Sequence, residues 1–286
     1  MSSRTRNSGA ALKERLSKGL LIAPGIHDGV SARQAVQAGA EAVYMTGFGV
    51  AGSLLGVPDI GLVSATEMTE RVRALAAASS PVPLIADGDN GHGGTANVER
   101  LVRAYEQAGA AAIQLEDQVL PKRCGHLDGK EIVSREEAVA KIKAAVGARD
   151  AGTFLVIART DARSVKGMDE ALWRAEAFLS AGADVLFVEA PQSLEELRVV
   201  AERFPGVPLM ANMVEDGKTP MLPPAELAAL GYRLVIFPVT ALLAAAHAYE
   251  TAYRRLLAGE QVLRSERITF QHYNEIMDLK SYLGRD

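Results

Sequence analysis

Residues 96–116, ANVERLVRAYEQAGAAAIQLE, contain the unit from which the fold of this chain can be argued. Apolar residues first recur at helical spacing, Gly109 then ends the helix, and an apolar run follows from Ala112 to Glu116. Glycine is common just after a helix because it adopts the left-handed backbone conformation without strain. A continuous apolar run is typical of a strand that is buried on both faces, as in a parallel sheet. The stretch therefore predicts a helix, a tight turn and a buried parallel strand.

The same pattern, a predicted helix followed by Ala-Gly-Ala and a predicted strand, occurs three times, with Ala-Gly-Ala at residues 38–40, 108–110 and 181–183. Apolar runs predict eight strands, at Leu20–Ala23, Ala42–Thr46, Leu84–Asp87, Ala112–Glu116, Phe154–Arg159, Val185–Glu189, Leu209–Asn212 and Leu234–Phe237. Helices are predicted between them, among them Ala96–Ala108, Arg135–Ala148, Asp169–Ala181, Ser193–Phe204 and Pro223–Leu230. Because no linker interrupts residues 20–250, we expect an α/β fold with one (β/α)8 TIM-type barrel rather than two doubly wound domains.

The segment 260–286 lies beyond the eighth strand–helix unit. Residues 265–282 have a helical pattern, and the predicted barrel has no place left for another helix. We therefore expect residues 1–286 to form one barrel domain, with a C-terminal helical tail that packs on a neighbouring subunit.

The bulk composition is that of an ordinary globular protein, with 48% hydrophobic and 23% charged residues. A formal net charge of −4 argues against nucleic acid or an anionic membrane as a partner. The most apolar stretch, Leu234–Ala248, contains Pro238 and His247 and falls short of the about 18 uninterrupted apolar residues of a membrane span. The single cysteine excludes an internal disulfide and fits a reducing compartment. We expect a cytoplasmic protein.

Polar side chains stand at or just after the carboxyl end of most of the predicted strands. In (β/α)8 barrels the chemistry takes place at the carboxyl ends of the strands. The residues found there are Tyr44, Thr46, Asp87, Asp89, Glu116, Asp117, Arg159, Asp161, Glu189 and Asn212. A random surface would not gather so many polar groups on one rim, so the sequence predicts an active site there.

Three of these residues, Asp87, Asp89 and Glu116, offer carboxylates with no clustered histidines or cysteines. Hard oxygen ligands of this kind suit Mg2+ or Mn2+ rather than zinc. Asp59, in the loop Gly56-Val57-Pro58-Asp59, is a candidate fourth member of the set. The glycine-rich turn around His92 lacks the spacing and the lysine of a phosphate-binding loop, so we interpret it as part of the metal site.

The loop after the fourth strand reads Lys122-Arg123-Cys124-Gly125-His126 and surrounds a thiol with basic groups. A lone cysteine is usually a small buried apolar residue, but these neighbours are costly to bury. The cations favour the thiolate, whereas a dianionic substrate would favour the protonated thiol that a general acid needs. Cys124 is therefore the candidate proton donor, with Lys122 and His126 as candidate catalytic residues beside it. Nucleophilic thiolate catalysis is the alternative.

Taken together, these motifs resemble the isocitrate lyase/phosphoenolpyruvate mutase superfamily over about residues 10–255. The cysteine loop is specific to its lyase branch, which includes methylisocitrate lyases and 2,3-dimethylmalate lyases. The matching segments are Tyr44-Met45-Thr46-Gly47, Gly56-Val57-Pro58-Asp59, Asp87-Gly88-Asp89, Glu116-Asp117-Gln118, Pro121 to His126, Ala158-Arg159-Thr160-Asp161, Glu189-Ala190-Pro191 and Asn212.

The resemblance implies a barrel whose eighth helix is exchanged between subunits, usually in a homotetramer built as a dimer of helix-swapped dimers. It implies Mg2+, with Mn2+ as the alternative, bound directly by Asp87, while Asp59, Asp89 and Glu116 act mainly through water. The residues implied to surround the substrate are Thr46, Gly47, Gly125, Arg159, Asn212 and Pro238.

The reaction implied by the resemblance is a retro-aldol cleavage of a small di- or tricarboxylate. A base takes the proton of the 2-hydroxyl, the C2–C3 bond breaks, and a 2-oxo acid such as pyruvate leaves. The metal and Arg159 stabilise the developing charge, and Cys124 protonates the new carbanion. Tyr44 is the leading candidate for the base and Glu189 is the other; Glu189 could instead order Arg159 through an ion pair.

Two residues bear on the choice of substrate. Leu243 stands where methylisocitrate lyases carry an arginine, and Pro238 stands where oxaloacetate acetylhydrolases carry a serine. An apolar wall there favours a 2-alkylmalate such as 2,3-dimethylmalate. The alternatives are a 2-methylisocitrate lyase, an oxaloacetate hydrolase or decarboxylase, and a carboxyphosphonoenolpyruvate-type mutase. A non-catalytic barrel is disfavoured because Asp87, Cys124 and Arg159 are all present.

Overall fold

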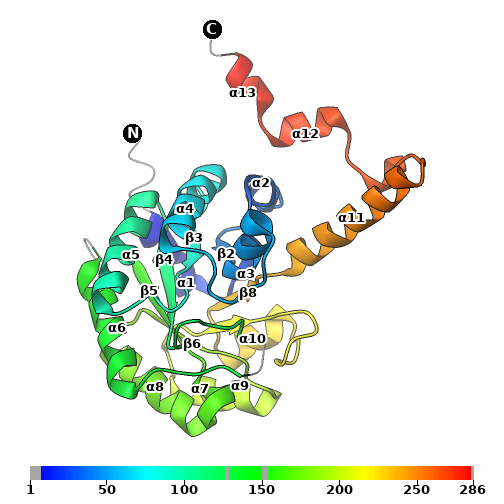
Figure 1. The fold of residues 1–286 in the computed structure, drawn as a ribbon. Helices are drawn as coiled ribbons and strands as arrows, with labels where there is room; N and C mark the ends of the chain where they lie inside the picture. The colour runs from blue at the N-terminus through cyan, green and yellow to red at the C-terminus, as the bar shows by residue number, and fades with distance from the viewer. Residues whose placement is uncertain (1–7, 126–128, 150–153, 285–286) are drawn as a thin grey trace.

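The computed structural model describes residues 8–125, 129–149 and 154–284 of this chain. Eight parallel strands form one sheet in the order β6-β5-β4-β3-β2-β1-β8-β7, surrounded by helices (Figure 1). A parallel bridge between Leu186 and Leu209 brings the two edge strands together, so the sheet is a nearly closed barrel. The expected (β/α)8 architecture is confirmed. The strands are β1 Leu21–Ile26, β2 Val43–Met45, β3 Leu84–Asp87, β4 Ala112–Glu116, β5 Leu155–Thr160, β6 Val185–Val188, β7 Met210–Asn212 and β8 Leu234–Phe237.

Six of the described α-helices, α2, α3, α4, α6, α9 and α12, begin at a residue whose side chain caps a free backbone N–H group. Ser134 and Ser193 accept hydrogen bonds of 3.1 Å from the backbone N–H groups of Glu137 and Glu196. Gly109 and Gly231 end their helices in the left-handed conformation. The helices are α1 Ser8–Lys18, α2 Gly29–Gln37, α3 Gly47–Val50, α4 Ala65–Ser79, α5 Thr95–Ala108, α6 Arg135–Ala148, α7 Ala162–Lys166, α8 Met168–Ser180, α9 Leu194–Arg203, α10 Pro224–Leu230, α11 Thr240–Leu257, α12 Phe270–Ile276 and α13 Leu279–Leu283, with a π-helical turn at Ala51–Leu55 and a 3-10 turn at Arg264–Glu266.

The first strand extends further than the apolar run predicted. The expectation ended it at Ala23, before Pro24 and Gly25, but β1 continues to Ile26. Pairing with β8 continues through Pro24, and pairing with β2 begins at Gly25. A side chain at Gly25 would overlap the backbone of Pro238, so glycine allows the two strands to approach. The ends of the other strands differ from the predicted ones by no more than one residue.

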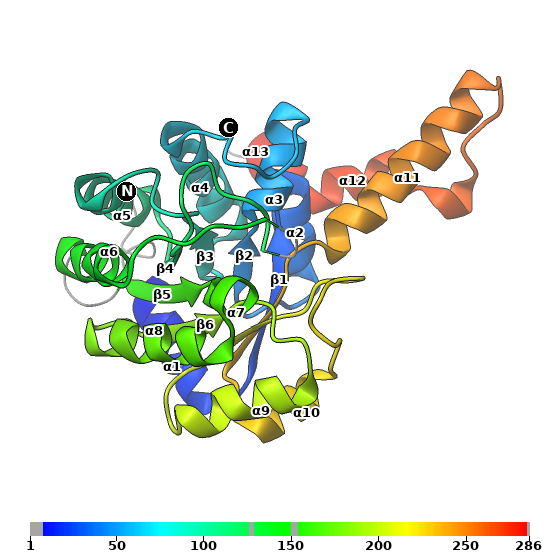
Figure 2. The same cartoon turned by 60° about the horizontal axis from the view of Figure 1, so that its bottom comes forward.

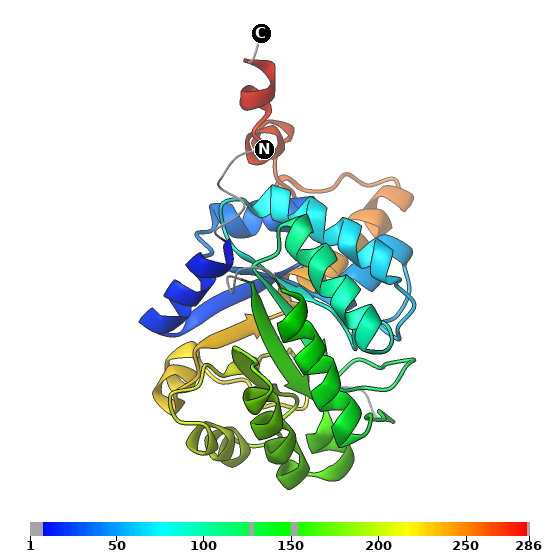
Figure 3. The same cartoon turned by 90° about the vertical axis from the view of Figure 1, so that its left-hand side faces the viewer.

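Two apolar layers fix the barrel. One lies between the strands and the outer helices. The other fills the inside of the barrel, where Leu12 and Leu16 of α1 join inward-facing strand residues such as Leu21 and Leu155. Because these strand residues stand at the amino ends, α1 closes that end of the barrel (Figure 3). The carboxyl ends remain open for a site.

The eighth helix leaves the barrel. α11 projects away from it (Figures 1 and 2), and none of its residues is buried. The chain then turns back, and α12 packs against α2. Ile276 of α12 is buried. The expected helical tail is therefore present as two short helices, and its packing on a neighbouring subunit stays a prediction. In the parts of the chain described, no helix is long and apolar enough to cross a membrane.

Candidate active site

A cavity of about 350 Å³ opens at the carboxyl ends of the strands. Most of the residues predicted for the site line it, although they come from positions spread across the sequence. They are Tyr44, Thr46, Asp59, Asp87, Lys122, Cys124, Gly125, Arg159, Glu189, Asn212 and Pro238.

Three other predicted residues lie directly behind this lining. The backbone N–H of Gly47 donates a 3.1 Å hydrogen bond to Asp87 Oδ2. Asp89 Oδ1 is 2.6 Å from Lys122 Nζ, and Glu116 Oε2 is 3.4 Å from Arg159 Nε. His126 lies outside the described residues.

The structure adds lining residues that sequence reasoning missed. Phe48 comes from α3, and the segment Val214–Gly217 comes from the loop after β7. Val239 follows β8, and Leu243, noted for its bearing on the substrate, lines the same cavity. Phe48, Val214–Gly217 and Val239 do not stand directly after a predicted strand in a recognisable motif, so the sequence carried no signal for them, whereas Leu243 was noted from the family resemblance.

Carboxylates dominate one side of the cavity. Lys122 Nζ lies 2.6 Å from both Asp59 Oδ1 and Asp89 Oδ1. Burial, followed by the nearby charge of Asp89, raises the pKa of Asp87 to about 6. Burial likewise raises the pKa of Glu116 well above its usual range. Burial alone would lower the pKa of Lys122, but Asp89 and Glu116 raise it well above its ordinary value, so its ammonium is charged.

This donor set fits a hard divalent cation in its chemistry. Every candidate ligand is a carboxylate oxygen, and Glu116 Oε1 is buried with no hydrogen-bond partner in the described part of the chain. The carboxylates do not form a ready-made cage, since among the described residues no three Asp, Glu, His or Cys side chains are grouped so as to hold a metal ion. Mg2+ usually keeps several waters and needs only one or two direct carboxylates, so a smaller direct set is compatible with it.

Arg159 presents a fixed cation to the cavity. Its Nε and Nη2 atoms donate hydrogen bonds of 2.9 and 3.1 Å to the two oxygens of Asp161. Its guanidinium also lies over the ring of Phe187, 5.3 Å from the centroid. Burial would lower the pKa of Arg159, but Asp161 and Glu189 raise it well above its ordinary value. A planar donor held in this way can bind a carboxylate or a developing oxyanion.

Tyr44 and Glu189, the two candidates for the base, differ in their surroundings. The Tyr44 hydroxyl donates a 2.8 Å hydrogen bond to Gln114 Oε1. Burial, and then the charge of Asp87, raises the pKa of Tyr44 well above 10, so the phenol is neutral. Glu189 is buried, and it accepts hydrogen bonds of 3.2 and 3.3 Å from Asn212 Nδ2.

The cysteine loop is held against these groups. Gln118 bonds both backbone groups of Arg123 at 2.9 Å, accepting from its N–H and donating to its carbonyl. The partly buried Cys124 comes next and lines the cavity. A side chain at Gly125 would overlap the Arg159 guanidinium and the Glu189 carboxylate. Glycine at this position therefore lets the backbone lie directly against the side chains of Arg159 and Glu189.

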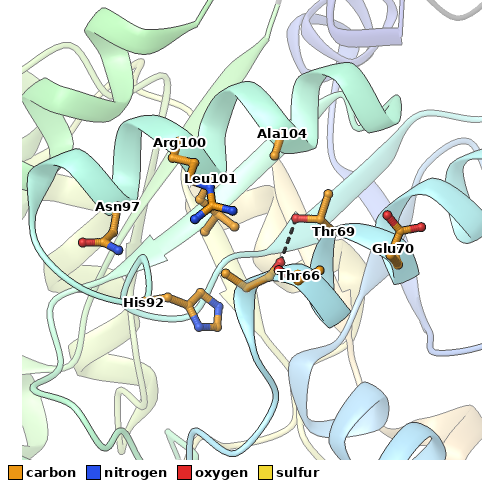
Figure 4. Close-up of a pocket in the computed structure, with 9 residues that line it drawn as sticks. Thr66, Thr69, Glu70, His92, Asn97, Arg100, Leu101 and Ala104 are labelled. Atoms are coloured by element: carbon orange, nitrogen blue, oxygen red, sulfur yellow. Dashed lines mark hydrogen bonds between the residues drawn. The ribbon is translucent and has the colours of Figure 1, made fainter.

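A second cavity, of about 190 Å³, lies between α4 and α5 (Figure 4). His92 reaches it from the turn after β3, and its Nε2 is 3.9 Å from Asp89 Oδ2. The hydrogen bond drawn there runs from Thr69 Oγ1 to the carbonyl of Ala65, within α4. Most of its polar residues, including Arg100, are exposed to water. The cavity over the strand ends is therefore the candidate active site.

Comparison with known proteins gives consistent matches along the chain. The family described as "Phosphoenolpyruvate phosphomutase" matches residues 11–257. A 2,3-dimethylmalate lyase from Eubacterium barkeri is 48% identical over 277 residues, which cover 96% of this chain and 95% of that protein. A 2-methylisocitrate lyase from Aeropyrum pernix is 47% identical over 282 residues, 97% of this chain and 90% of that protein. The crystal structure of a 2,3-dimethylmalate lyase in a trigonal form superposes with a TM-score of 0.94 at 39% identity, covering 98% of this chain and 94% of that one.

Proposed function

The chain belongs to the phosphoenolpyruvate phosphomutase family, within the isocitrate lyase/phosphoenolpyruvate mutase superfamily, and is a carbon–carbon lyase; on that premise we propose that it cleaves the C2–C3 bond of a 2-alkylmalate with Mg2+ as its cofactor. The substrate class we propose is represented by 2,3-dimethylmalate, and its products are pyruvate and propionate. The similarity to dimethylmalate and methylisocitrate lyases is nearly equal, so the choice between them depends on the cavity.

We base the choice of substrate on which positively charged side chains line the cavity. Among its described lining residues, Arg159 and Lys122 are the permanent cations, and both already face carboxylates. The rest of the wall includes apolar Pro238 and Leu243 and the acidic pair Glu215–Asp216. A third carboxylate would have to be buried against these groups without a cation, which is costly. A dicarboxylate with alkyl substituents avoids that cost.

The proton transfers are assigned to two side chains. The carboxylate of Glu189 takes the proton of the 2-hydroxyl, and the electrons of the C2–C3 bond remain on C3 as the new 2-oxo group forms. The thiol of Cys124 gives its proton to C3 and becomes a thiolate. The net change moves one proton from oxygen to carbon and involves no oxidation. Arg159 binds the carboxylate and the developing oxygen charge.

Glu189 is preferred over Tyr44 as the base because of protonation. A base must be deprotonated near neutral pH, and burial keeps the Tyr44 phenol protonated by raising its pKa. Tyr44 instead donates to Gln114, whose Nε2 lies 3.3 Å from Asp87 Oδ1. We assign Tyr44 to ordering the carboxylate side of the site.

The proposed Mg2+ would be held directly by Asp87, with Asp59, Asp89 and Glu116 acting mainly through water. When bound, Mg2+ supplies electrostatic stabilisation of the negative charge that develops on the substrate oxygens. Lys122, which contacts Asp59 and Asp89, adds a second positive charge beside the carboxylates.

A substrate panel tests the proposed function. Purified protein with Mg2+ is given 2,3-dimethylmalate, 2-methylmalate, 2-methylisocitrate, oxaloacetate and phosphonopyruvate, and the 2-oxo acid or oxalate that forms is measured. We expect kcat/KM to be highest for an alkylmalate, by at least about tenfold over 2-methylisocitrate, which corresponds to about 1.4 kcal/mol. Highest activity with 2-methylisocitrate, oxaloacetate or phosphonopyruvate would refute the proposed substrate.

We also propose that α11 packs on a second copy of this chain, in a homotetramer built from helix-swapped dimers. Support comes from the exposure of its large apolar side chains, among them Tyr249, Tyr253, Leu256 and Leu257. Light scattering after size exclusion tests the assembly. We expect four copies for the full chain and a smaller species for the double variant Tyr253→Glu, Leu257→Glu.

A further inference from the structure

The cysteine loop has a second attachment that the proposed chemistry does not use. The side chain of Lys130 is 1% exposed, and its Nζ donates hydrogen bonds to the carbonyl of Gly125 and, at 2.8 Å, to Asp161 Oδ1. Gly125 is the residue directly after the thiol. A buried ammonium therefore bonds the backbone next to Cys124 to a carboxylate on β5's carboxyl end.

The same carboxylate orients the substrate-binding arginine. Asp161 has no exposed surface and accepts from Lys130 through Oδ1 and from Arg159 through both oxygens. Its backbone N–H donates a 2.9 Å hydrogen bond to Asp117 Oδ1, which fixes Asp161 to β4. Asp161 thus joins two groups that act on opposite ends of the bond being cleaved.

The energetics favour a positioning role over a contribution to stability. Taking a lysine ammonium out of water costs several kcal/mol, and a buried ion pair often stabilises no more than apolar residues of the same size. Lys130 compensates that cost with a carboxylate and a backbone carbonyl, and both partners belong to the active site. Its net effect is therefore to fix their relative position. On the other side of the thiol, Gln118 fixes Arg123 in the same way.

We propose that Lys130 is a positioning residue that fixes the carbonyl of Gly125, and with it the thiol of Cys124, to the carboxylate that orients Arg159. The inference rests on the proposed function for the roles of Cys124 and Arg159. The attachment itself does not depend on those roles, so it can be tested without turnover.

The single cysteine makes the test direct, because alkylation of the chain reports only on Cys124. The rate of alkylation by iodoacetamide is measured against pH, and the plateau rate at high pH, where the thiol is fully ionised, reports access to sulfur. We expect Lys130→Met to raise the plateau rate about tenfold or more, because a hydrogen bond to a charged group contributes about 1.5 to 3 kcal/mol.

A matched control is available at the other end of the barrel. Arg149 is also a largely buried cation that bonds a carboxylate, Asp184, and a carbonyl, that of Phe154 at 2.9 Å. We expect Arg149→Met to lower the melting temperature without changing the plateau rate. An equal rise in both variants, or no rise in Lys130→Met, would overturn the proposal.

Two further measurements keep the test decisive. If Lys130→Met does not fold, Lys130→Gln retains a neutral donor, and we expect a smaller rise; an unchanged plateau rate would again overturn the proposal. With 2,3-dimethylmalate, we expect the folded variant to lose kcat by about tenfold while KM changes less than about threefold, since the thiol and not the binding site is displaced. A failure of the lyase assignment would remove this second measurement but not the alkylation result.

Discussion

The side-chain amide of Asn212 lies 3.2 and 3.3 Å from the two oxygens of the Glu189 carboxylate. The two residues stand at the carboxyl ends of the neighbouring strands β7 and β6, and both line the cavity. Asn212 therefore orients the carboxylate toward the cavity without giving it a proton or a full positive charge. This arrangement fixes the direction of the Glu189 carboxylate.

Replacing Glu189 by glutamine tests its role as the base. The amide has nearly the same shape but cannot take up a proton, so we expect kcat for 2,3-dimethylmalate to fall by about 100-fold or more. KM should change little, and the Tyr44→Phe control should lose less than about tenfold. If Glu189 only orders Arg159, the variant would instead raise KM and keep most of kcat. Steady-state kinetics distinguish the two results.

Leu243→Arg tests the basis of substrate choice. An arginine at this position of the cavity wall would offer a cation to a third carboxylate. We expect the ratio of kcat/KM for 2-methylisocitrate to that for 2,3-dimethylmalate to rise by about tenfold or more. The Leu243→Met variant, of similar volume and no charge, serves as the control. A ratio that is unchanged in the arginine variant would contradict the assignment of this wall.

Metal removal tests the carboxylate cluster. Dialysis against a chelator should abolish turnover, and Mg2+ or Mn2+ should restore it, because the donors are all hard oxygens. Isothermal titration should show that Asp87→Asn loses Mg2+ affinity by more than Asp59→Asn does. Full activity of the chelator-treated protein would contradict a metal-dependent reaction.

An ion-pair network outside the site predicts an acid-dependent stability. Glu170 accepts hydrogen bonds from Arg135 and Arg174, and the hydrogen bond from Arg135 is the main reason that its pKa falls from 4.5 to about 2. Because folding lowers this pKa, the ionised carboxylate stabilises the folded protein at pH values above the unfolded-state pKa. The stabilisation is lost as pH falls toward 2 and the carboxylate is protonated. Because Arg135 is 44% exposed, solvent screening reduces the contribution to about 1 kcal/mol.

Denaturant unfolding of Glu170→Gln measures this effect. We expect the variant to be less stable than the parent at pH 7 and the difference to shrink steadily between about pH 5 and pH 2. A difference that does not depend on pH would show that the charge of Glu170 is not responsible.

The strand–helix repeat and the residues after the strands could be predicted because both are local. A buried parallel strand needs an apolar run, and the carboxyl ends of all eight strands meet at one end of the barrel. Knowing that Asp87, Arg159 and Glu189 each stand at the carboxyl end of a strand was therefore enough to bring them together. Apolarity alone could not place the end of β1, because Gly25 is required by the approach of Pro238, which is distant in sequence.

Residues that reach the site from loops could not be predicted from the sequence. Lys130 lies in a polar stretch with no periodic pattern, and its burial depends on Asp161, which is 31 positions away. The segment Val214–Gly217 likewise reaches the cavity through the path of a loop rather than through a strand end. Neither distance in sequence nor residue type indicates such contacts.

Proton transfer from the thiol of Cys124 to the new carbanion is tested by the turnover of Cys124→Ala and Cys124→Ser with 2,3-dimethylmalate. Both variants keep Arg159 and the carboxylates, so substrate binding should be retained, while kcat should fall by about 100-fold or more because no acid stands at C3. Turnover at the parent rate in both variants would show that Cys124 is not the proton donor.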